Sequence, residues 1–150
     1  ILDRDDWGLR ANLAYGVTTA IDVQPGTIDI LAYEDLVDAG LLVGPRTLST
    51  GPGLFSNNSF TSQAPARSVL RRYKDAYRVR NLKAYISGSR QQRQYLVEAA
   101  RELKLMATTE GALDMKLNLT HITDGFTGQE HPYPLVELYE DSVSFIAQSA

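Results

Sequence analysis

Apolar residues along this chain follow two alternating patterns. Short stretches rich in Val, Ile, Leu and Thr are typical of strands, and longer stretches with apolar residues every three or four positions are typical of helices. The first pattern predicts strands at residues 17–22, 46–50, 82–86, 105–109 and 128–131. The second predicts helices from about Asp5 to Gly16, at 30–41, 65–77 and 90–103, in the stretch before Asp124, and at 135–148.

This order of elements predicts an α/β fold with parallel strands. Strands that are separated by helices of this length are joined by right-handed crossover connections. No linker or low-complexity segment divides residues 1–150, so we expect one domain. A closed (β/α)8 barrel has eight strands and about 250 residues. The sequence therefore predicts a partial (β/α)8 TIM barrel, with parallel strands inside and helices outside.

Composition narrows the class of protein further. The 150 residues are 43% hydrophobic and 22% charged, and the net charge of −3 gives no electrostatic reason to expect nucleic acid binding. No apolar run approaches the roughly 20 residues of a membrane span. The sequence has no cysteine, which excludes disulfides, thiolate metal sites and cysteine nucleophiles.

Three ionisable residues fall at or near the carboxyl ends of predicted strands, namely Lys83, Glu110 and His131. Chemistry in parallel sheets and barrels takes place at this edge. Each residue also has an ordinary structural interpretation, such as a salt-bridged lysine or a hydrogen-bonded histidine at a strand end. His121 lies in a predicted helix, away from the strand ends, and is interpreted as a surface or packing residue.

Four runs of the sequence carry a resemblance to a known family: Asn12–Asp22, Gly44–Gly53, Leu82–Tyr85 and Gly128–His131. They look like the second, third, fourth and sixth strand units in the barrel of the amidohydrolase superfamily of metal-dependent hydrolases. Two further runs are similar to the amidohydrolase-like modules that follow a TolB-type β-propeller: Arg90–Gln94 and Thr123–Gly128. The resemblance covers essentially the whole chain, as units two to six of a barrel.

This resemblance implies one or two divalent metal ions, with zinc as the expected metal. Such ions lower the pKa of bound water and polarise a scissile carbonyl. His131 matches the sixth-strand metal ligand of the family. Lys83 matches a fourth-strand lysine that bridges two metals as a carbamate in several subgroups. A lysine ammonium repels a cation, so this role requires loss of the proton and reaction with carbon dioxide.

Glu110 stands where the family usually supplies a fifth-strand histidine. A carboxylate can bind the same metals, so Glu110 can replace that ligand. It can equally be a general base, an acid at the start of the following helix, or a sign that metal binding has been lost.

Four further residues are candidates for substrate contacts. Asp22 and Thr50 lie at the ends of predicted strands. Tyr85 is two residues beyond Lys83, which places both on one face of a strand. Arg90 begins a predicted helix, where its guanidinium could bind a substrate carboxylate through two hydrogen bonds.

Two classes of function follow from these observations. The first is a metal-dependent hydrolase acting on a C–N bond, in a cyclic amide or a peptide-like amide. The second is a non-catalytic barrel that serves as a binding or interaction module. Lys83 together with His131 favours the hydrolase, whereas the missing fifth-strand histidine favours the binding module.

The family's first-strand His-x-His pair does not occur in this sequence, and no segment matches its eighth-strand Asp. A sheet of five strands would also leave two open edges and an interior without an opposing wall. We therefore expect the remainder of a barrel, or a partner chain, to close the sheet. We also expect residues 1–150 alone to bind metal poorly and to hydrolyse nothing.

Overall fold

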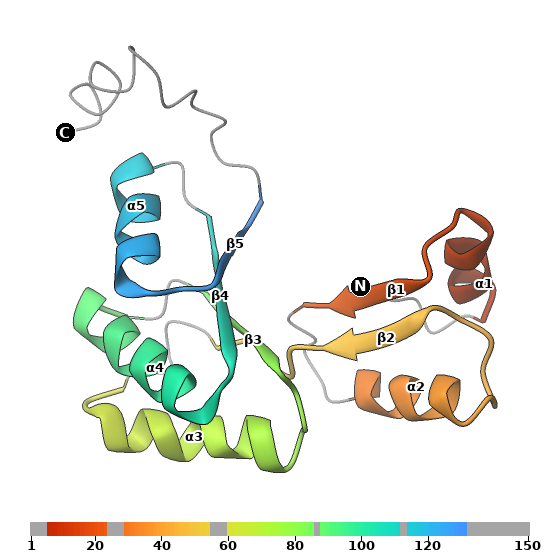
Figure 1. Ribbon diagram of the computed structural model, residues 1–150, viewed down its shortest axis with the longest axis horizontal. Coiled ribbons are helices and arrows are strands. Elements are labelled where there is room, and N and C mark those ends of the chain that lie inside the picture. Colours follow the sequence, from red (N-terminus) through yellow and green to blue (C-terminus); the bar gives the residue numbers. More distant parts are fainter. Residues whose placement is uncertain (1–5, 24–28, 55–59, 86–87, 112–113, 132–150) are drawn as a thin grey trace.

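The computed structural model describes residues 6–23, 29–54, 60–85, 88–111 and 114–131. Helices and strands alternate along this part of the chain (Figure 1). The strands are β1 (Thr19–Asp22), β2 (Arg46–Ser49), β3 (Asn81–Ala84), β4 (Met106–Glu110) and β5 (Gly128–Glu130). The helices are α1 (Asp6–Ala14), α2 (Asp29–Asp38), α3 (Gln63–Asp75), α4 (Arg90–Leu103) and α5 (Met115–Asp124). The predicted order of these elements is confirmed, and the helix predicted at 135–148 lies outside the described residues.

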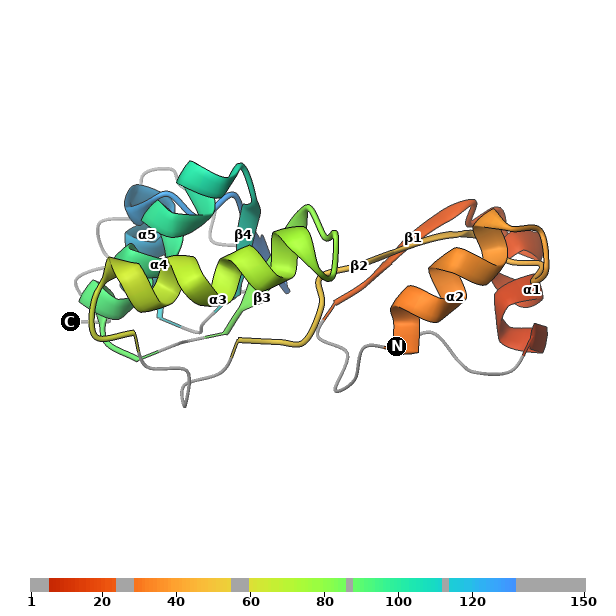
Figure 2. The same cartoon turned by 90° about the horizontal axis from the view of Figure 1, so that it is seen from below.

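The described strands form two small parallel sheets and no closed barrel. β1 pairs with β2 in one sheet, and β4 lies between β3 and β5 in the other. Figures 1 and 2 show the first sheet with α1 and α2 at one end of the molecule, and the second sheet with α3, α4 and α5 at the other. The predicted parallel α/β arrangement is confirmed. The single barrel wall that we expected appears as two sheets in this part of the chain.

The segment that follows β2 leads from the first sheet to β3. Gly51 adopts a left-handed φ of 68°, and a Cβ atom there would lie 3.1 Å from the ring of Tyr73. Pro52 has no backbone N–H to donate. Leu54 then joins the edge of β3 as an isolated bridge, through two backbone hydrogen bonds of 2.9 Å. In the described part of this segment, the chain therefore leaves the first sheet and pairs with β3 at Leu54.

A hydrophobic core lies between the second sheet and the helices α3 and α4. Its buried residues are Leu54, Phe60, Ala66, Leu70, Tyr73, Val79, Leu82, Ala84, Leu96, Val97, Ala99, Ala100, Leu105, Ala107 and Phe126. A capping box fixes the start of α4. The backbone N–H of Gln92 donates to the Ser89 side chain, and the backbone N–H of Ser89 donates to the Gln92 side chain. None of the described helices is long and apolar enough to cross a membrane.

Alternation along the strands gives the second sheet two different faces. Leu82 is buried in the core beneath this sheet. Its neighbour Lys83 pairs in register with Thr108, and Glu110 pairs in register with Glu130. These four polar side chains therefore leave the sheet on the face opposite to the core.

Candidate functional site

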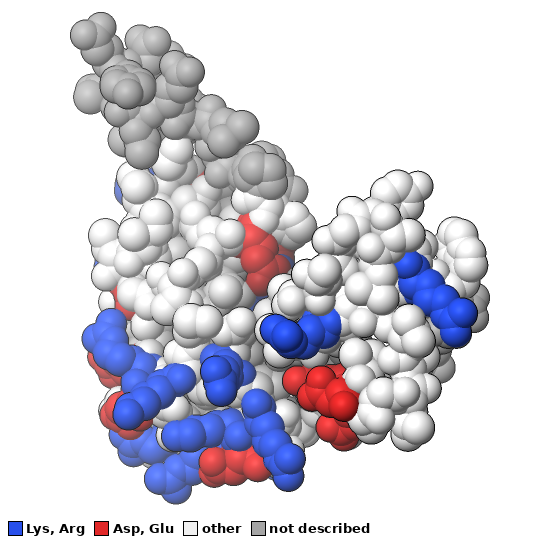
Figure 3. Space-filling model, turned by 45° about the vertical axis from the view of Figure 1, so that its right-hand side comes forward, with Lys and Arg blue, Asp and Glu red and all other residues white. Residues whose placement is uncertain are grey.

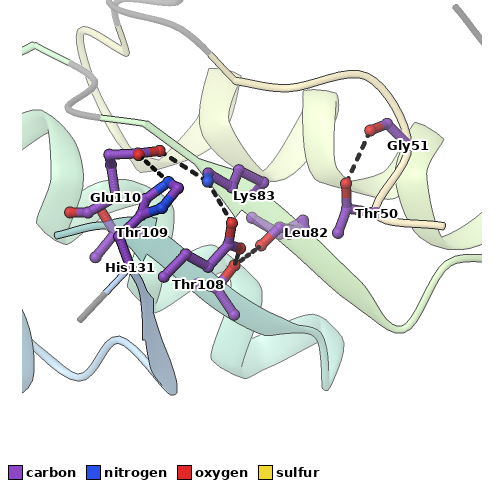
Figure 4. Close-up of polar contacts among 9 residues, drawn as sticks. Thr50, Gly51, Leu82, Lys83, Thr108, Thr109, Glu110 and His131 are labelled. Carbon is purple, nitrogen blue, oxygen red and sulfur yellow. Dashed lines mark hydrogen bonds and ion pairs between the residues drawn. The ribbon is translucent and has the colours of Figure 1, made fainter. Parts of the chain in front are cut away.

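The carboxyl ends of β3, β4 and β5 bring together three of the predicted site residues. Lys83 lies on β3, Glu110 ends β4, and His131 directly follows β5. Figure 4 shows their side chains pointing toward one another. Nζ of Lys83 lies 2.7 Å from Oε2 of Glu110, and Nε2 of His131 lies 2.5 Å from Oε1 of the same carboxylate. Glu110 therefore contacts both other members.

Lys83 is held in this cluster as an ammonium. Its side chain is 3% exposed, and its Nζ also donates to Oε2 of Glu130. The contact with Glu110 is an ion pair without a well-aligned hydrogen bond. Burial by itself lowers the pKa of Lys83, but the contacts with Glu110 and Glu130 outweigh burial and raise the pKa above its ordinary value. The buried positive charge therefore lies between two carboxylates.

Glu130 and Thr108 belong to the cluster but were not among the predicted site residues. Oγ1 of Thr108 donates to Oε1 of Glu130 across 2.7 Å. Two signals in the sequence could have identified them. Glu130 directly precedes His131 in the Glu-His pair at the end of the predicted strand, and Thr108 stands two residues before Glu110, on the same face of its strand.

His131 approaches Glu110 from a strained backbone position. Its φ of 67° lies in the left-handed region, which residues other than glycine seldom adopt. The side chain is half-exposed. Because an ionised carboxylate only accepts hydrogen bonds, Nε2 of His131 carries the proton in this contact. The arrangement therefore places an N–H group against Glu110 at the open side of the cluster.

Tyr85 borders the cluster, as its position two residues from Lys83 suggested. Nζ of Lys83 lies 4.7 Å from the centre of the Tyr85 ring, within the range of a cation–π contact. Burial raises the pKa of Tyr85, the charge of Lys83 opposes this, and the charges of Glu110 and Glu130 add to it. The ring therefore favours the charged state of Lys83.

Asp22 and Thr50 lie at the other sheet. Asp22 ends β1 and Thr50 follows β2, and both are buried. The backbone N–H of Thr50 donates to the carbonyl of Asp22 across 3.3 Å, and the Thr50 hydroxyl donates to the carbonyl of Gly51 across 3.1 Å. These two candidates are next to each other, on a different sheet from Lys83 and Glu110.

Arg90 joins two helices rather than entering the cluster. Its guanidinium donates to both carboxylate oxygens of Asp124, at 2.8 and 3.0 Å, and so ties the start of α4 to the end of α5. Gln94 donates to the same carboxylate across 3.0 Å. The ability of Arg90 to bind a carboxylate is used within the chain, so its predicted substrate contact has no support from this placement.

Charge is unevenly distributed over the protein. Eleven of the 15 Lys and Arg residues lie between Arg67 and Lys104, a stretch that holds only three of the 18 Asp and Glu residues. Figure 3 shows much of this positive charge gathered in the lower part of the molecule. Although the net charge is −3, residues 67–104 are therefore basic and the rest of the chain is acidic.

A divalent metal does not fit the cluster as it stands. The donor types suit zinc, because Glu110 and Glu130 supply carboxylates and His131 supplies an imidazole. The ammonium of Lys83, however, lies between the two carboxylates and would repel a cation. Within the described residues, no group of three or more His, Asp or Glu side chains is arranged to hold a metal ion. The metal and the carbamate on Lys83 remain predictions.

No protein-family model matches this chain, and no curated protein matches it. Three solved structures share its fold. A Bifidobacterium longum protein described as a prolidase has a TM-score of 0.65 and 19% identity, over 81% of this chain and 34% of its own. A Xaa-Pro dipeptidase with methionine bound in its active site has a TM-score of 0.65 and 16% identity, over 81% of this chain and 38% of its own. An uncharacterized protein has a TM-score of 0.67 and 15% identity, over 95% of this chain and 43% of its own.

At these identities the likeness concerns the fold alone. The chain spans between 34% and 43% of the length of the three structures, which are therefore much longer than the matched part. Two of the three are described as a prolidase and a dipeptidase, so the fold is one that is also found in hydrolases.

Proposed function

We propose that this chain forms part of a hydrolase that cleaves a peptide-like amide bond at the cluster of Lys83, Glu110 and His131. One observation carries the proposal: a buried ammonium, a carboxylate and an imidazole meet at the carboxyl ends of three adjacent parallel strands. Enzymes with parallel sheets place their catalytic groups at this edge. The likeness to prolidase and Xaa-Pro dipeptidase structures supports the choice of a peptide-like substrate.

The three side chains have the properties that amide hydrolysis requires. A base must take a proton from the attacking water, an acid must protonate the departing amine, and a positive group must stabilise the carbonyl oxygen as it becomes negative. Glu110 is the proposed base. His131 is the proposed acid in its imidazolium form, and loss of its proton to the amine leaves a neutral imidazole. Glu110 then returns the proton taken from water to His131, which it contacts. The ammonium of Lys83 is the proposed positive group.

The finer form of the proposal is the metal-dependent amidohydrolase that the sequence resemblance implies. Zinc is the expected metal, and Glu110 and His131 are the expected ligands. This form requires a change at Lys83, since its ammonium must leave the space between Glu110 and Glu130 before a cation can enter. A carbamate on Lys83 would meet that requirement by replacing the positive charge with a negative one.

The proposal also includes a wall that faces these strands. Three apolar strand residues, Ile21, Leu48 and Met106, are 42%, 40% and 50% exposed. Apolar side chains on a barrel interior are normally covered by the opposite strands. We propose that the remainder of a (β/α)8 barrel, or a partner chain, covers them and completes the substrate site.

An assay of the full-length protein against Xaa-Pro dipeptides and other small amides tests the function. The released amino acids are measured by mass spectrometry. We expect Glu110→Gln to reduce kcat by at least about a hundredfold, because it removes the proposed base. Glu102→Gln is the matched control, since Glu102 lies on the exposed surface of α4 in a salt bridge with Arg67. It should leave kcat unchanged.

Full activity of the Glu110→Gln variant would exclude the proposed chemistry. A wild-type protein that binds dipeptides without cleaving any of them would instead favour the binding module. Elemental analysis and treatment with a chelator distinguish the two forms of the hydrolase. Loss of activity with the chelator, restored by zinc, would establish the metal-dependent form, whereas unchanged activity of metal-free protein would exclude it.

A further inference from the structure

The hydroxyl of Thr108 makes a contact that the proposed chemistry does not use. Oγ1 of Thr108 lies 2.7 Å from Oε1 of Glu130 and 3.3 Å from the carbonyl oxygen of Leu82. A hydroxyl has one proton to donate. The shorter contact is to a carboxylate, and hydrogen bonds to charged acceptors are the stronger ones. The proton is therefore directed mainly to Glu130.

The two oxygens of Glu130 consequently have different partners. Oε1 accepts from Thr108, and Oε2 accepts from the ammonium of Lys83. A carboxylate that is held at both oxygens cannot rotate without losing one of these contacts. The orientation of Glu130, and with it the position of Nζ in Lys83, thus depends on Thr108.

The register of the sheet provides room for this contact. Thr108 pairs with Lys83 on one side and with Gly128 on the other. A Cβ atom at Gly128 would lie 3.3 Å from the methyl carbon of Thr108, which is a tight contact. The absence of a side chain at Gly128 leaves space for the Thr108 side chain on the same face of the sheet.

We propose that Thr108 is a positioning residue, which fixes the carboxylate of Glu130 and through it holds the Lys83 ammonium next to Glu110. The positioning itself depends only on the contacts within the chain. Its effect on hydrolysis rests on the proposed function.

Chemical labelling of lysine tests the positioning directly. The chain has four lysines, and Lys74, Lys104 and Lys116 are exposed and serve as internal references for the buried Lys83. The full-length protein is treated with a limiting amount of an acetylating reagent, and each lysine is followed by mass spectrometry. Lysine reacts as the free amine, so the rate at Lys83 reports how firmly the ammonium is held by its carboxylate partners.

We expect Thr108→Val, which removes the hydroxyl and retains a branched side chain, to raise the relative labelling of Lys83 roughly fivefold, as expected for loss of one hydrogen bond. Thr108→Ser restores the hydroxyl and should return labelling to the wild-type rate. Thr109→Val is the matched control, because Thr109 is the next residue of β4, is fully buried and faces the other side of the sheet. It should label as the wild type does.

Two results would overturn the proposal. In the first, Thr108→Val labels as the wild type while Glu130→Gln raises the labelling of Lys83, which would show that Glu130 does not need Thr108. In the second, Thr108→Val and Thr109→Val raise labelling equally, which would show a general loosening of β4. If the wild-type protein is active, Thr108→Val should also lower kcat with little change in KM, and Thr108→Ser should restore kcat. If the wild type hydrolyses nothing, the proposed function fails while the labelling still decides the role of Thr108.

Discussion

Both sheets of this protein are built from parallel strands joined by helices, but different kinds of strand residue are buried in each. In the β3–β5 sheet, the face toward α3 and α4 is buried in a hydrophobic core. In the β1–β2 sheet, the buried strand residues are Asp22, Thr47 and Ser49. The apolar Ile21 and Leu48 of the same strands are about two-fifths exposed. The buried strand residues of the first sheet are thus polar, whereas the core face of the second sheet is formed mainly by the apolar Leu82, Ala84 and Ala107.

In the β3–β5 sheet, the hydrophobic core and the candidate site lie on opposite faces. A buried ammonium between carboxylates needs strands that hold fixed positions, since a misplaced charge away from water is costly. The core beneath β3 and β4 supplies that support for Lys83. The first sheet has no comparable core in the described residues, and its apolar side chains are those that the proposed additional wall would cover.

The largest effect that we predict comes from removing a core side chain of the second half. Leu70 lies on α3 with no exposed surface, so Leu70→Ala should lower the free energy of unfolding by about 3 kcal/mol. Leu48 is 40% exposed on β2, and Leu48→Ala should lower it by roughly 0.5 kcal/mol. Urea denaturation followed by circular dichroism measures both values.

Similar losses for these two variants would contradict the comparison between the sheets. Leu48 would then be covered in solution by another part of the full-length protein or by a partner chain. That outcome would support the barrel wall proposed for this face. Repeating the measurement at several protein concentrations distinguishes the two sources, because only cover by a separate chain depends on concentration.

A smaller loss is expected at the charged face of the same sheet. Lys83→Met leaves Glu110 and Glu130 without the ammonium that lies between them. Removing one partner of a buried pair is strongly destabilising, but these carboxylates are 24% and 21% exposed, so we expect a loss of about 2 kcal/mol at pH 7. Lys104→Met at the exposed end of α4 is the control and should have little effect.

Urea denaturation at pH 7 measures both variants. A Lys83→Met loss no larger than that of Lys104→Met would show that the ammonium of Lys83 does not stabilise the folded protein through Glu110 and Glu130.

The order of the elements could be predicted because each rests on local periodicity. Leu70 and Tyr73 on α3, and Leu96 with Ala99 and Ala100 on α4, follow the helical spacing that the sequence shows. The separation into two sheets could not be predicted in this way. The chain between the two sheets contains the left-handed Gly51 next to the Tyr73 ring, and this contact joins residues far apart in the sequence.

The candidate site was predicted in part for the same reason. Strand ends in a parallel sheet meet at one edge, so Lys83, Glu110 and His131 could be expected to lie near each other. The partner of Arg90 could not be foreseen, because Asp124 is 34 residues away and is reached only when α4 and α5 are packed. Closure of the barrel and metal binding stay predictions.

The smallest effect that we predict separates the protein's two histidines. His121 on α5 is fully buried, neither of its ring nitrogens has a hydrogen-bond partner, and its ring packs edge-on against Phe126 at 5.3 Å. Burial lowers the pKa of His121, the nearby charge of Arg93 lowers it further, and the charge of Asp124 opposes both. The folded protein therefore disfavours the charged form of His121.

Because the pKa of His121 is lower in the folded state, the unfolded chain takes up this proton first as the pH falls. The stability due to neutral His121 is complete above the unfolded value of about 6.5. It is lost progressively as the pH falls from there to the folded pKa. His121→Phe should remove this component of the pH dependence, whereas His131→Gln, at the half-exposed site histidine, should retain it. Urea denaturation between pH 5 and 8 measures both profiles, and a His121→Phe profile identical to that of the wild type would show that another group is responsible for the loss.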